Sequence, residues 1–311
     1  MLASAEPEET APHRTGVAAA GGLLVDLVQT ARPKQWIKNV LVFAAPGAAG
    51  VLGHARPLER AAAAFAIFCA VSAGTYFFND TLDAAADRQH PRKSRRPIAA
   101  GRVTVPAALA VGTLLTAAGI GASAALSSQM VAVTGAYAAI TIAYSLRLKH
   151  EPVLDMGALA SGFVLRAVAG GVATGVPLSN WFIIVASFGS LFMVGGKRHA
   201  EHVELGEARA GHRPILGDYS LGYLRYVRSV SSAVAIAGYC LWAFEKAAAP
   251  GAVALWFELS IAPFVLAILR YALVIDTGGG GAPEEVVLAD RTIQLLGLAW
   301  VLLFGLGVYG V

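Results

Sequence analysis

Long apolar runs separated by short polar connections dominate the sequence. A helix needs about 20 mostly apolar residues to cross the roughly 30 Å of hydrocarbon in a bilayer. Runs of this kind lie at residues 36–53, 60–79, 103–126, 129–147, 153–173, 180–197, 225–244, 250–274 and 290–310. The pattern predicts an all-α integral membrane protein, built as a bundle of about nine transmembrane helices.

The segment before the first run has a different pattern. Apolar residues between Leu23 and Ala31 recur at helical spacing, with Asp26 among them, which predicts a short amphipathic helix lying in the membrane surface. Three glutamates lie among the first nine residues, whereas a secretory signal would be basic there. We therefore expect a cytoplasmic tail over residues 1–31 and a transmembrane domain over residues 32–311.

Composition agrees with a location in lipid. The chain is 56% hydrophobic and 14% charged, with a mean hydropathy of +0.61, which is more apolar surface than a soluble core of this length can hide. Its 24 basic residues against 20 acidic residues indicate cytoplasmic loops and anionic headgroups in a membrane protein, so we expect no nucleic-acid partner. Cys69 and Cys240 lie inside apolar runs, which leaves no disulfide framework and no metal-thiolate spacing.

Basic residues are concentrated in alternate connections. Six lie between Arg88 and Arg102, after the second run, and others follow the fourth and sixth runs. The connections on the opposite side are poor in charge, with Arg56 and Arg60 as a mild exception. Because Lys and Arg are enriched in cytoplasmic loops, the pattern predicts a multi-pass protein of the plasma (inner) membrane with its N-terminus inside and its C-terminus outside.

An acidic motif ends the second run, where residues 79–87 read N-D-T-L-D-A-A-A-D. On a continuing helix Asp80, Asp83 and Asp87 occupy positions i, i+3 and i+7, so their carboxylates share one face. A carboxylate in the bilayer region costs about 2.5 kcal/mol or more unless it is neutralised. Magnesium takes one or two carboxylates together with phosphate oxygens. The motif therefore predicts a magnesium-bound diphosphate; a solvated helix end is the alternative.

Further polar residues fall at the same membrane face. Arg95 follows the acidic motif in a basic run that is also the ordinary signal of a cytoplasmic loop. Tyr144 and Lys149 end the fourth run, where such residues also serve as interfacial anchors. Lys34 and Asn39 lie at the mouth of the first run, where a belt of snorkelling side chains is the alternative. Each is a candidate substrate-binding residue.

Arg166 and residues 195–201 point to a buried binding site. Arg166 lies about three turns into the fifth run, where a cation is expensive, so we expect it to face a polar cavity. Residues 195–201 read G-G-K-R-H-A-E: the glycines let the backbone approach a ligand, and Lys197 and Arg198 suit phosphate oxygens. A pair of Lys197 with Glu201 along the helix is the alternative.

Together these residues resemble a known family, the UbiA-type intramembrane prenyltransferases. The resemblance rests on Arg32-Pro33 with Asn39, on the N-D-x-x-D-x-x-x-D string, and on Tyr144-Ser145, Leu148-Lys149 and Asp155. It implies an all-helical bundle around a central cavity open to the cytoplasmic side, and a catalytic domain over residues 32–311. It also implies Mg2+ at the cavity mouth, held by Asp80, Asp83 and Asp87, and a homo-oligomer such as a trimer.

Residues 195–201 depart from the family members that prenylate aromatic rings, which carry a second aspartate-rich motif at this place. A basic second site expects a second anion. The chain is therefore similar to the mycobacterial branch that transfers 5-phosphoribose from 5-phosphoribosyl 1-diphosphate to decaprenyl phosphate, releasing diphosphate, for cell-wall arabinan synthesis. This implies Lys197 as a catalytic residue beside the aspartates, and substrate contacts from Lys34, Asn39, Asn79, Arg95, Tyr144, Lys149, Arg166, Arg198 and Glu201.

Three questions stay open from the sequence. Aromatic prenyl transfer from a polyprenyl diphosphate uses the same scaffold, but the missing second aspartate motif argues against it. A membrane transporter would also hold charges such as Arg166 and Glu258 within its spans, but it leaves the acidic motif without a function. The sequence does not divide the basic residues between the donor 5-phosphate and the acceptor phosphate, and it identifies no partner for Glu258 or Arg270.

Overall fold

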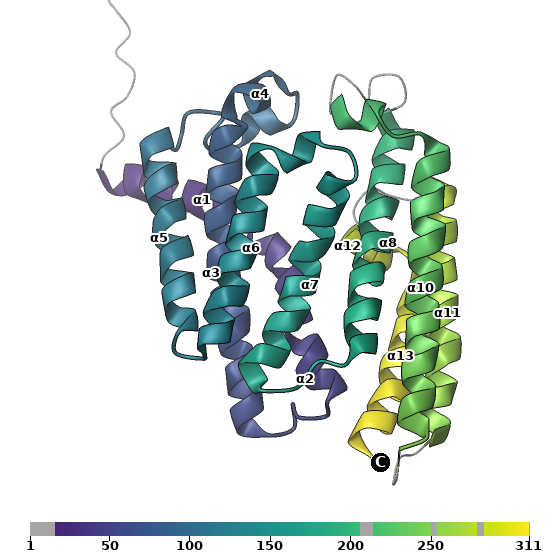
Figure 1. Cartoon of the computed structure of the whole chain (residues 1–311). Coiled ribbons are helices and arrows are strands. Elements are labelled where there is room, and N and C mark those ends of the chain that lie inside the picture. The colour runs from purple at the N-terminus through teal and green to yellow at the C-terminus, as the bar shows by residue number, and fades with distance from the viewer. Residues whose placement is uncertain (1–15, 206–213, 250–253, 279–282, 311) are drawn as a thin grey trace, which may run out of the picture.

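The chain folds into a bundle of helices, as a computed structural model shows (Figure 1). The structure describes residues 16–205, 214–249, 254–278 and 283–310, and no strand occurs in these ranges. Residues 1–15 of the expected tail and the first four residues of the expected run 250–274 lie outside the described residues. The prediction of an all-α membrane protein is confirmed.

In the part of the chain that the structure describes, eight helices are long and apolar enough to cross a membrane. They are α3 (Ala55–Leu82), α5 (Val105–Ser123), α6 (Ser128–Leu146), α7 (Leu154–Thr174), α8 (Asn180–Leu205), α10 (Leu221–Ala247), α11 (Ala254–Asp276) and α13 (Arg291–Tyr309). The shorter elements are α1 (Gly16–Ala31), η1 (Pro33–Phe43), α2 (Ala44–Ala48), α4 (Ala84–Gln89), η2 (Lys93–Arg95), η3 (Leu148–His150), η5 (Pro214–Gly217) and α12 (Pro283–Ala289).

The first expected span has a different helix type from the others. Its 11 residues in η1 form a 3-10 helix, and the 5 residues of α2 complete it. A 3-10 helix rises about 2.0 Å per residue against about 1.5 Å in an α-helix. The pair therefore extends over about 30 Å, close to the hydrocarbon thickness. The prediction of about nine crossing segments is met, although one of them is not an α-helix.

Backbone contact with α7 fixes η1 inside the bundle. η1 packs against α3 and α7, and Asn39 and Val42 are fully buried. A Cβ atom at Gly170 would lie 1.7 Å from the carbonyl oxygen of Val42, so only glycine admits this approach. Because Gly170 of α7 has no side chain, η1 can pack closely against α7 and place Asn39 in the interior.

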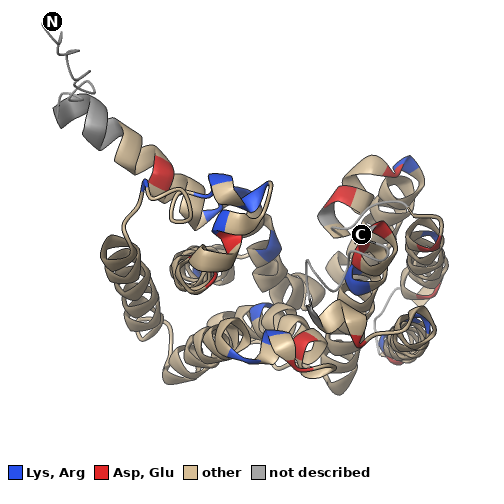
Figure 2. Ribbon diagram, turned by 90° about the horizontal axis from the view of Figure 1, so that it is seen from above, with Lys and Arg blue, Asp and Glu red and all other residues tan. Residues whose placement is uncertain are grey.

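The long helices follow one another around the bundle, as the view along them shows (Figure 2). α6 packs on α7, α7 on α8, α8 on α10, α10 on α11, and α11 on α13, while α3 packs against α5 and α6. Lys, Arg, Asp and Glu gather in the connections at the end that carries α4. This arrangement matches the alternation of charge-rich and charge-poor connections in the sequence.

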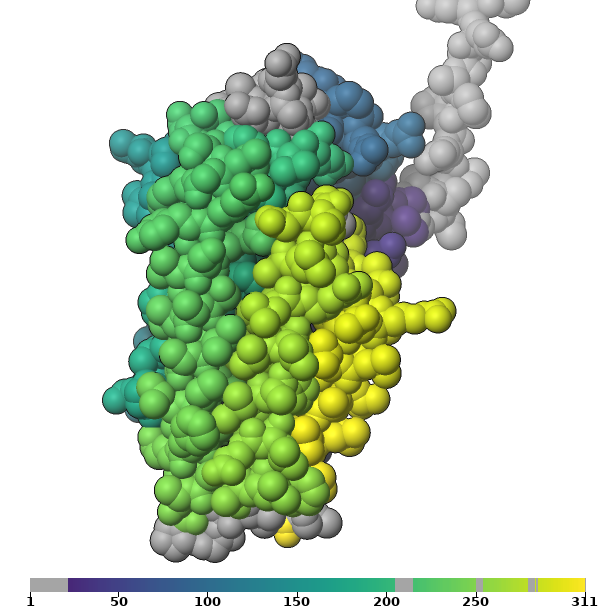
Figure 3. All heavy atoms as spheres, turned by 90° about the vertical axis from the view of Figure 1, so that its right-hand side faces the viewer, coloured from purple at the N-terminus to yellow at the C-terminus, as the bar shows by residue number. Residues whose placement is uncertain are grey.

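The outer face of the C-terminal helices is apolar. Figure 3 shows this face, which α10, α11 and α13 form. Leucines on α11 and α13 are about half exposed, among them Leu266, Leu269, Leu298 and Leu302. So large an apolar surface requires lipid around it. Arg270 of α11 pairs with Asp290 at the start of α13, at 2.8 Å, which supplies the partner that the sequence did not identify, whereas Glu258 is exposed near the start of α11.

The amphipathic helix α1 has two different faces. Leu27 and Ala31 pack against a core cluster formed by residues of α3, α4, α5 and the connection before α5, while Leu24 and Val25 are more than 60% exposed. Asp26 pairs with Arg102 at 2.9 Å. One face of the predicted amphipathic helix therefore anchors α1 to the bundle. Contact of its exposed face with the membrane surface stays a prediction.

We predict that Gly170→Ala destabilises the protein, because its Cβ would meet the Val42 carbonyl and overpacking costs about 1–3 kcal/mol or more. The temperature of unfolding in detergent should fall by several degrees. Gly157→Ala is the matched control in the same helix, because its Cβ meets nothing within 4 Å. Equal unfolding temperatures for the two variants would contradict this packing.

Candidate active site

A cavity of about 710 Å3 lies within the bundle at the charge-rich end. Its walls come from η1, α3, α6, α7, α8 and the segment of residues 90–96. Of the described residues, nine basic side chains line it against three acidic ones: Arg32, Lys38, Arg92, Lys93, Arg96, Lys149, Arg166, Lys197 and Arg198, against Asp83, Glu201 and Glu204. A concave surface with this excess of positive charge is suited to a ligand with several negative charges.

The acidic motif lies at the mouth of this cavity, but not on one unbroken helix. α3 ends at Leu82 and α4 begins at Ala84, which corrects the prediction of a continuing helix. The backbone N–H groups of Asp83 and Asp87 still donate to the carbonyls four residues earlier, at 2.9 and 2.8 Å. The helical spacing of the carboxylates is therefore largely kept across the bend.

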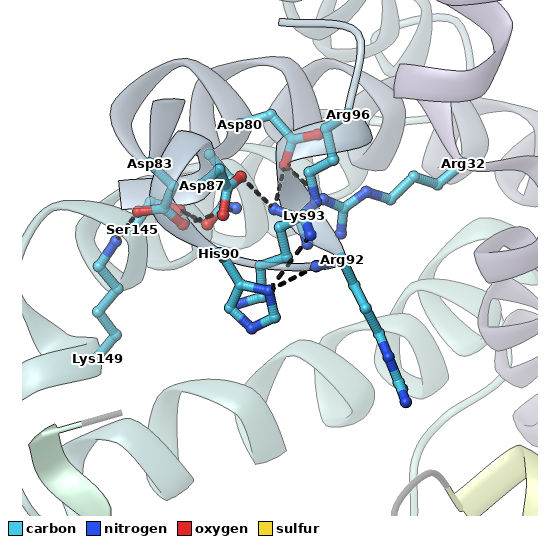
Figure 4. A network of polar contacts seen from close by, with 11 residues as sticks. Arg32, Asp80, Asp83, Asp87, His90, Arg92, Lys93, Arg96, Ser145 and Lys149 are labelled. Carbon is cyan, nitrogen blue, oxygen red and sulfur yellow. Dashed lines mark hydrogen bonds and ion pairs between the residues drawn. The ribbon is translucent and has the colours of Figure 1, made fainter. Parts of the chain in front are cut away.

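The three aspartates have different partners (Figure 4). The guanidinium of Arg96 contacts Asp80 at 3.1 Å and Asp87 at 2.7 Å through one nitrogen. Asp80 also pairs with Arg32. Asp83 instead pairs with Lys149 from η3. Asp80 and Asp87 thus converge on one cationic position, while Asp83 lines the cavity itself.

Asn79 fixes the orientation of Asp83. Its side-chain amide donates to Asp83 at 3.2 Å, and its carbonyl oxygen accepts from the hydroxyl of Ser145 at 3.1 Å. Ser145 belongs to the Tyr144-Ser145 motif at the end of α6. This contact brings together two motifs that are 66 residues apart in the sequence.

Burial makes the counter-charges at the mouth necessary. Asp80 and Asp87 are each 3% exposed, and a buried carboxylate without a partner costs several kcal/mol. Arg32 reaches Asp80 from the turn between α1 and η1, where its backbone is left-handed at φ 53°. This strained conformation indicates that the surrounding structure holds the Arg32 side chain at the carboxylate.

The donor atoms at the mouth fit a hard cation. They are carboxylate oxygens, which magnesium prefers, with no thiolate among them. Within the described residues, no three His, Cys, Asp or Glu side chains lie close enough to hold a metal ion by themselves. Magnesium in proteins is commonly held by one or two carboxylates plus substrate phosphates. The residues therefore fit magnesium shared with a phosphate ligand, and do not form an all-protein cage.

A second buried network lies at the end of α8. Arg198 is 1% exposed and Asp155 is fully buried, and the two pair at 2.8 Å. Arg198 also contacts Glu201 at 2.7 Å and the hydroxyl of Tyr144 at 3.3 Å. Its guanidinium is thus matched by two carboxylates. Lys197 is more exposed, at 38%, and lies 4.0 Å from Glu201.

Tyr219 completes this network from the connection between α8 and α10. Its hydroxyl donates to Asp155 at 2.5 Å and accepts the backbone N–H of Val153 at 2.6 Å. Burial, and then the hydrogen bond to Asp155, raise the pKa of Tyr219. The phenol therefore keeps its proton at neutral pH and holds the start of α7 in place.

Arg166 lies deeper along the cavity wall. Its guanidinium donates to the side chain of Asn39 at 2.7 Å, to the hydroxyl of Tyr137 at 2.7 Å, and to the carbonyl of Gly162 at 2.8 Å. Asn39 itself is fully buried behind Arg166. Two residues far apart in the sequence, one on η1 and one on α7, thus form one unit.

The structure brings most of the predicted site residues together, with two exceptions. Lys34 and Arg95 are exposed and do not line the cavity, whereas Lys38 and Arg96 do. Lys38 lies four residues after Lys34 on η1. Because a 3-10 helix has three residues per turn, the two side chains point to different faces, which the spacing of an α-helix does not predict. Neither periodicity nor spacing distinguishes Arg96 from the neighbouring basic residues, because only the fold of residues 88–102 turns it toward the aspartates.

Comparison with known proteins agrees with this geometry. The sequence model of the UbiA prenyltransferase family matches residues 40–287. The decaprenyl-phosphate phosphoribosyltransferase of Corynebacterium glutamicum is 44% identical over 287 residues, covering 91% of this chain and 86% of that protein. The enzyme of the same description from Mycolicibacterium smegmatis is 42% identical, covering 92% and 93%.

Solved structures share the fold. A UbiA homologue from Archaeoglobus fulgidus, bound to GPP and Mg2+, superposes with a TM-score of 0.67 at 20% identity, covering 92% of this chain and all of that one. An apo UbiA homologue from Aeropyrum pernix gives a TM-score of 0.62 at 18% identity, covering 89% and 98%. The family match, the high identity to the curated relatives and the shared fold lead to one conclusion: the chain belongs to the UbiA prenyltransferase family.

Proposed function

We propose that the protein transfers 5-phosphoribose from 5-phosphoribosyl 1-diphosphate to decaprenyl phosphate and releases diphosphate. The carrying observation is a cavity with an acidic motif at its mouth and a large excess of basic side chains on its walls. Both substrates are polyanions, and the donor adds a leaving diphosphate. Relatives at 42–44% identity over most of the chain bear the name of this activity.

The reaction needs positioning and charge stabilisation more than proton transfer. A phosphate oxygen of the lipid forms the bond to ribose C1, and the bond from C1 to the diphosphate oxygen breaks, its electron pair leaving with diphosphate. The attacking phosphate is already anionic at neutral pH, so no strong general base is required. The protein's task is to hold the two substrates in line and to stabilise the leaving group.

Asp83 faces the cavity and, with Asp80 and Asp87, would hold Mg2+ together with the diphosphate. Bound there, Mg2+ would neutralise charge on the leaving group. Arg96 and Arg32 lie beside the same carboxylates and can receive diphosphate oxygens that the metal leaves uncompensated. Lys149 and Lys197 line the cavity on other walls and are candidates for further phosphate contacts.

The network around Arg198 gives this site a wall of fixed shape. Because two carboxylates already match Arg198, we assign it to holding Tyr144 and Glu201 in position. This modifies the expectation that residues 195–201 offer two cations to an anion: in this proposal Lys197 is the one that meets substrate, with a catalytic role beside the aspartates.

The location of the site follows from charge. We propose that the charge-rich end is cytoplasmic, in the plasma membrane, because its connections hold most of the basic residues, and that the donor enters from the cytoplasm. Residues 32–311 would form the catalytic domain and residues 1–31 a cytoplasmic tail. The product would serve cell-wall arabinan synthesis, and assembly as a homo-oligomer, a trimer for example, belongs to the same proposal.

The proposed reaction is tested with purified protein in lipid nanodiscs. Radiolabelled 5-phosphoribosyl 1-diphosphate, decaprenyl phosphate and Mg2+ should give a lipid-soluble labelled product, and chelation of Mg2+ should abolish it. Product from a prenyl diphosphate and an aromatic acid instead would identify an aromatic prenyltransferase. Absence of labelled lipid from active-site-intact protein would reject phosphoribosyl transfer.

We expect Asp83→Asn to reduce turnover by about 100-fold or more, the range seen when one charge-stabilising group is removed. Its folding should be little affected, because the pair with Lys149 is partly exposed, at 28% and 17%. Glu151→Gln is the control, since Glu151 pairs with Arg147 at the surface. Activity of Asp83→Asn equal to that of the control would contradict the role of this carboxylate.

Asp155→Asn, unlike Asp83→Asn, should lower the stability of the fold. It leaves buried Arg198 with one carboxylate instead of two, and breaking a buried pair costs about 3–5 kcal/mol. Thermal unfolding followed by size-exclusion chromatography should show a larger loss for this variant than for Asp83→Asn. Stability equal to that of the wild type would mean that Arg198 is not held by this pair.

A further inference from the structure

Arg166 is a buried cation whose hydrogen-bond partners are all neutral. Its side chain is 6% exposed. The three partners are the amide oxygen of Asn39, the carbonyl of Gly162 and the hydroxyl of Tyr137. None of these groups carries a negative charge. Among the described residues, no Asp or Glu lies within ion-pair distance of Arg166.

The other buried arginines are matched by acids. Arg198 pairs with Asp155 and Glu201, and Arg228 pairs with Asp276 at 3.1 Å. At the mouth, Arg32, Arg96 and Lys149 are each bound to an aspartate (Figure 4). An ionised group in a membrane span costs about 2.5–3.5 kcal/mol or more without compensation. Arg166 is thus an exception that calls for a counter-charge from elsewhere.

The surroundings of Arg166 leave room for such a counter-charge. Arg166, Gly162 and Tyr137 all line the cavity. A guanidinium has five N–H groups, and three are used here, so two remain on the terminal nitrogens. Gly162 contributes no side chain beside the guanidinium, and a Cβ atom there would lie in ordinary contact with it, at 3.5 Å. Two N–H groups on a planar cation suit a phosphate.

Arg166 is separated from the acidic motif along the axis of α3. Asn39 contacts Ser72 of α3 at 3.4 Å, and Ser72 precedes Asp83 by eleven residues, about 16 Å of helix. An anion at Arg166 is therefore a different group from a diphosphate at Asp83. Both proposed substrates carry such a group: the donor has a 5-phosphate beyond its ribose ring, and the acceptor has its own phosphate.

We propose that Arg166 binds a phosphate monoester of the substrates at a second, deeper subsite, with Asn39 and Tyr137 as positioning residues. This inference rests on the proposed function and deepens it. It distinguishes Arg166 from three other cations of the cavity. Arg32, Arg96 and Lys149 are balanced by aspartates before any ligand binds, whereas Arg166 is balanced only when a phosphate is bound. The ligand chemistry is the same for donor and acceptor, and the experiment distinguishes them.

Equilibrium binding to the full-length protein in nanodiscs tests the subsite. The probes are radiolabelled 5-phosphoribosyl 1-diphosphate with Mg2+, a short-chain polyprenyl phosphate, and the matching neutral polyprenol. Arg166→Met should weaken binding of one phosphate probe by about tenfold or more, as expected for loss of a charge-assisted contact. A loss confined to the donor places its 5-phosphate at Arg166. A loss confined to the polyprenyl phosphate, leaving polyprenol unchanged, places the acceptor there.

Arg60→Met is the matched control. Arg60 also donates to backbone carbonyls, those of Ala173 and Leu126, but it does not line the cavity. It should leave both binding constants unchanged. Folded Arg166→Met that binds both phosphates like the wild type overturns the subsite alone, whereas wild-type protein that binds neither probe overturns the proposed function together with the subsite.

Asn39→Asp keeps the test decisive if Arg166→Met does not fold. The new carboxylate would contact Arg166 where the amide oxygen now lies and supply the missing counter-charge. Ligand-free protein should then unfold at a higher temperature, while its affinity for the phosphate probe falls. Unchanged phosphate affinity in this variant would show that Arg166 is a structural residue only.

Discussion

The site depends on how charges are neutralised inside a membrane protein. Asp80 and Asp87 are almost fully buried at the mouth of the cavity, where water cannot stabilise them. They persist because Arg96 bridges both and Arg32 contacts one of them. The same positive groups that stabilise the carboxylates face a cavity suited to phosphates. The same positive charges therefore contribute both to the stability of the ligand-free protein and to its affinity for the ligand.

Two buried arginines on the cavity wall are neutralised to different degrees. Around Arg198, acids and a buried tyrosine satisfy the cation completely, which makes a rigid wall. Around Arg166, only neutral groups hold the cation. A ligand with two phosphate groups separated by a sugar would place one group at the aspartate-paired cations of the mouth, such as Arg96, and the other at Arg166. This division gives a physical basis for placing the leaving diphosphate at the mouth and another phosphate in the interior.

Backbone packing is the second requirement of the site. The 3-10 helix η1 carries Asn39 into the interior because Gly170 lets its backbone touch α7. Arg32, at the start of η1, turns toward Asp80 from a left-handed backbone conformation. One short segment thus supplies a contact to each end of the cavity, and it joins the surface helix α1 to the catalytic residues.

The sequence by itself determined the fold class, the spans and the acidic motif. Apolar runs of sufficient length can lie only in lipid, and helical spacing follows directly from residue order, so these features are local. Asn79, Asp80, Asp83 and Asp87 could be recognised from spacing alone, and the resemblance to the family followed from a few short motifs.

The tertiary structure decided which cation pairs with which acid. Four features depend on groups that are distant in the sequence. They are the pairing of the aspartates with Arg96 and not Arg95, the bend at Asp83, the 3-10 geometry of η1, and the ion pair between Arg198 and Asp155. Ion pairing and close packing act through space, and a linear pattern does not contain those distances.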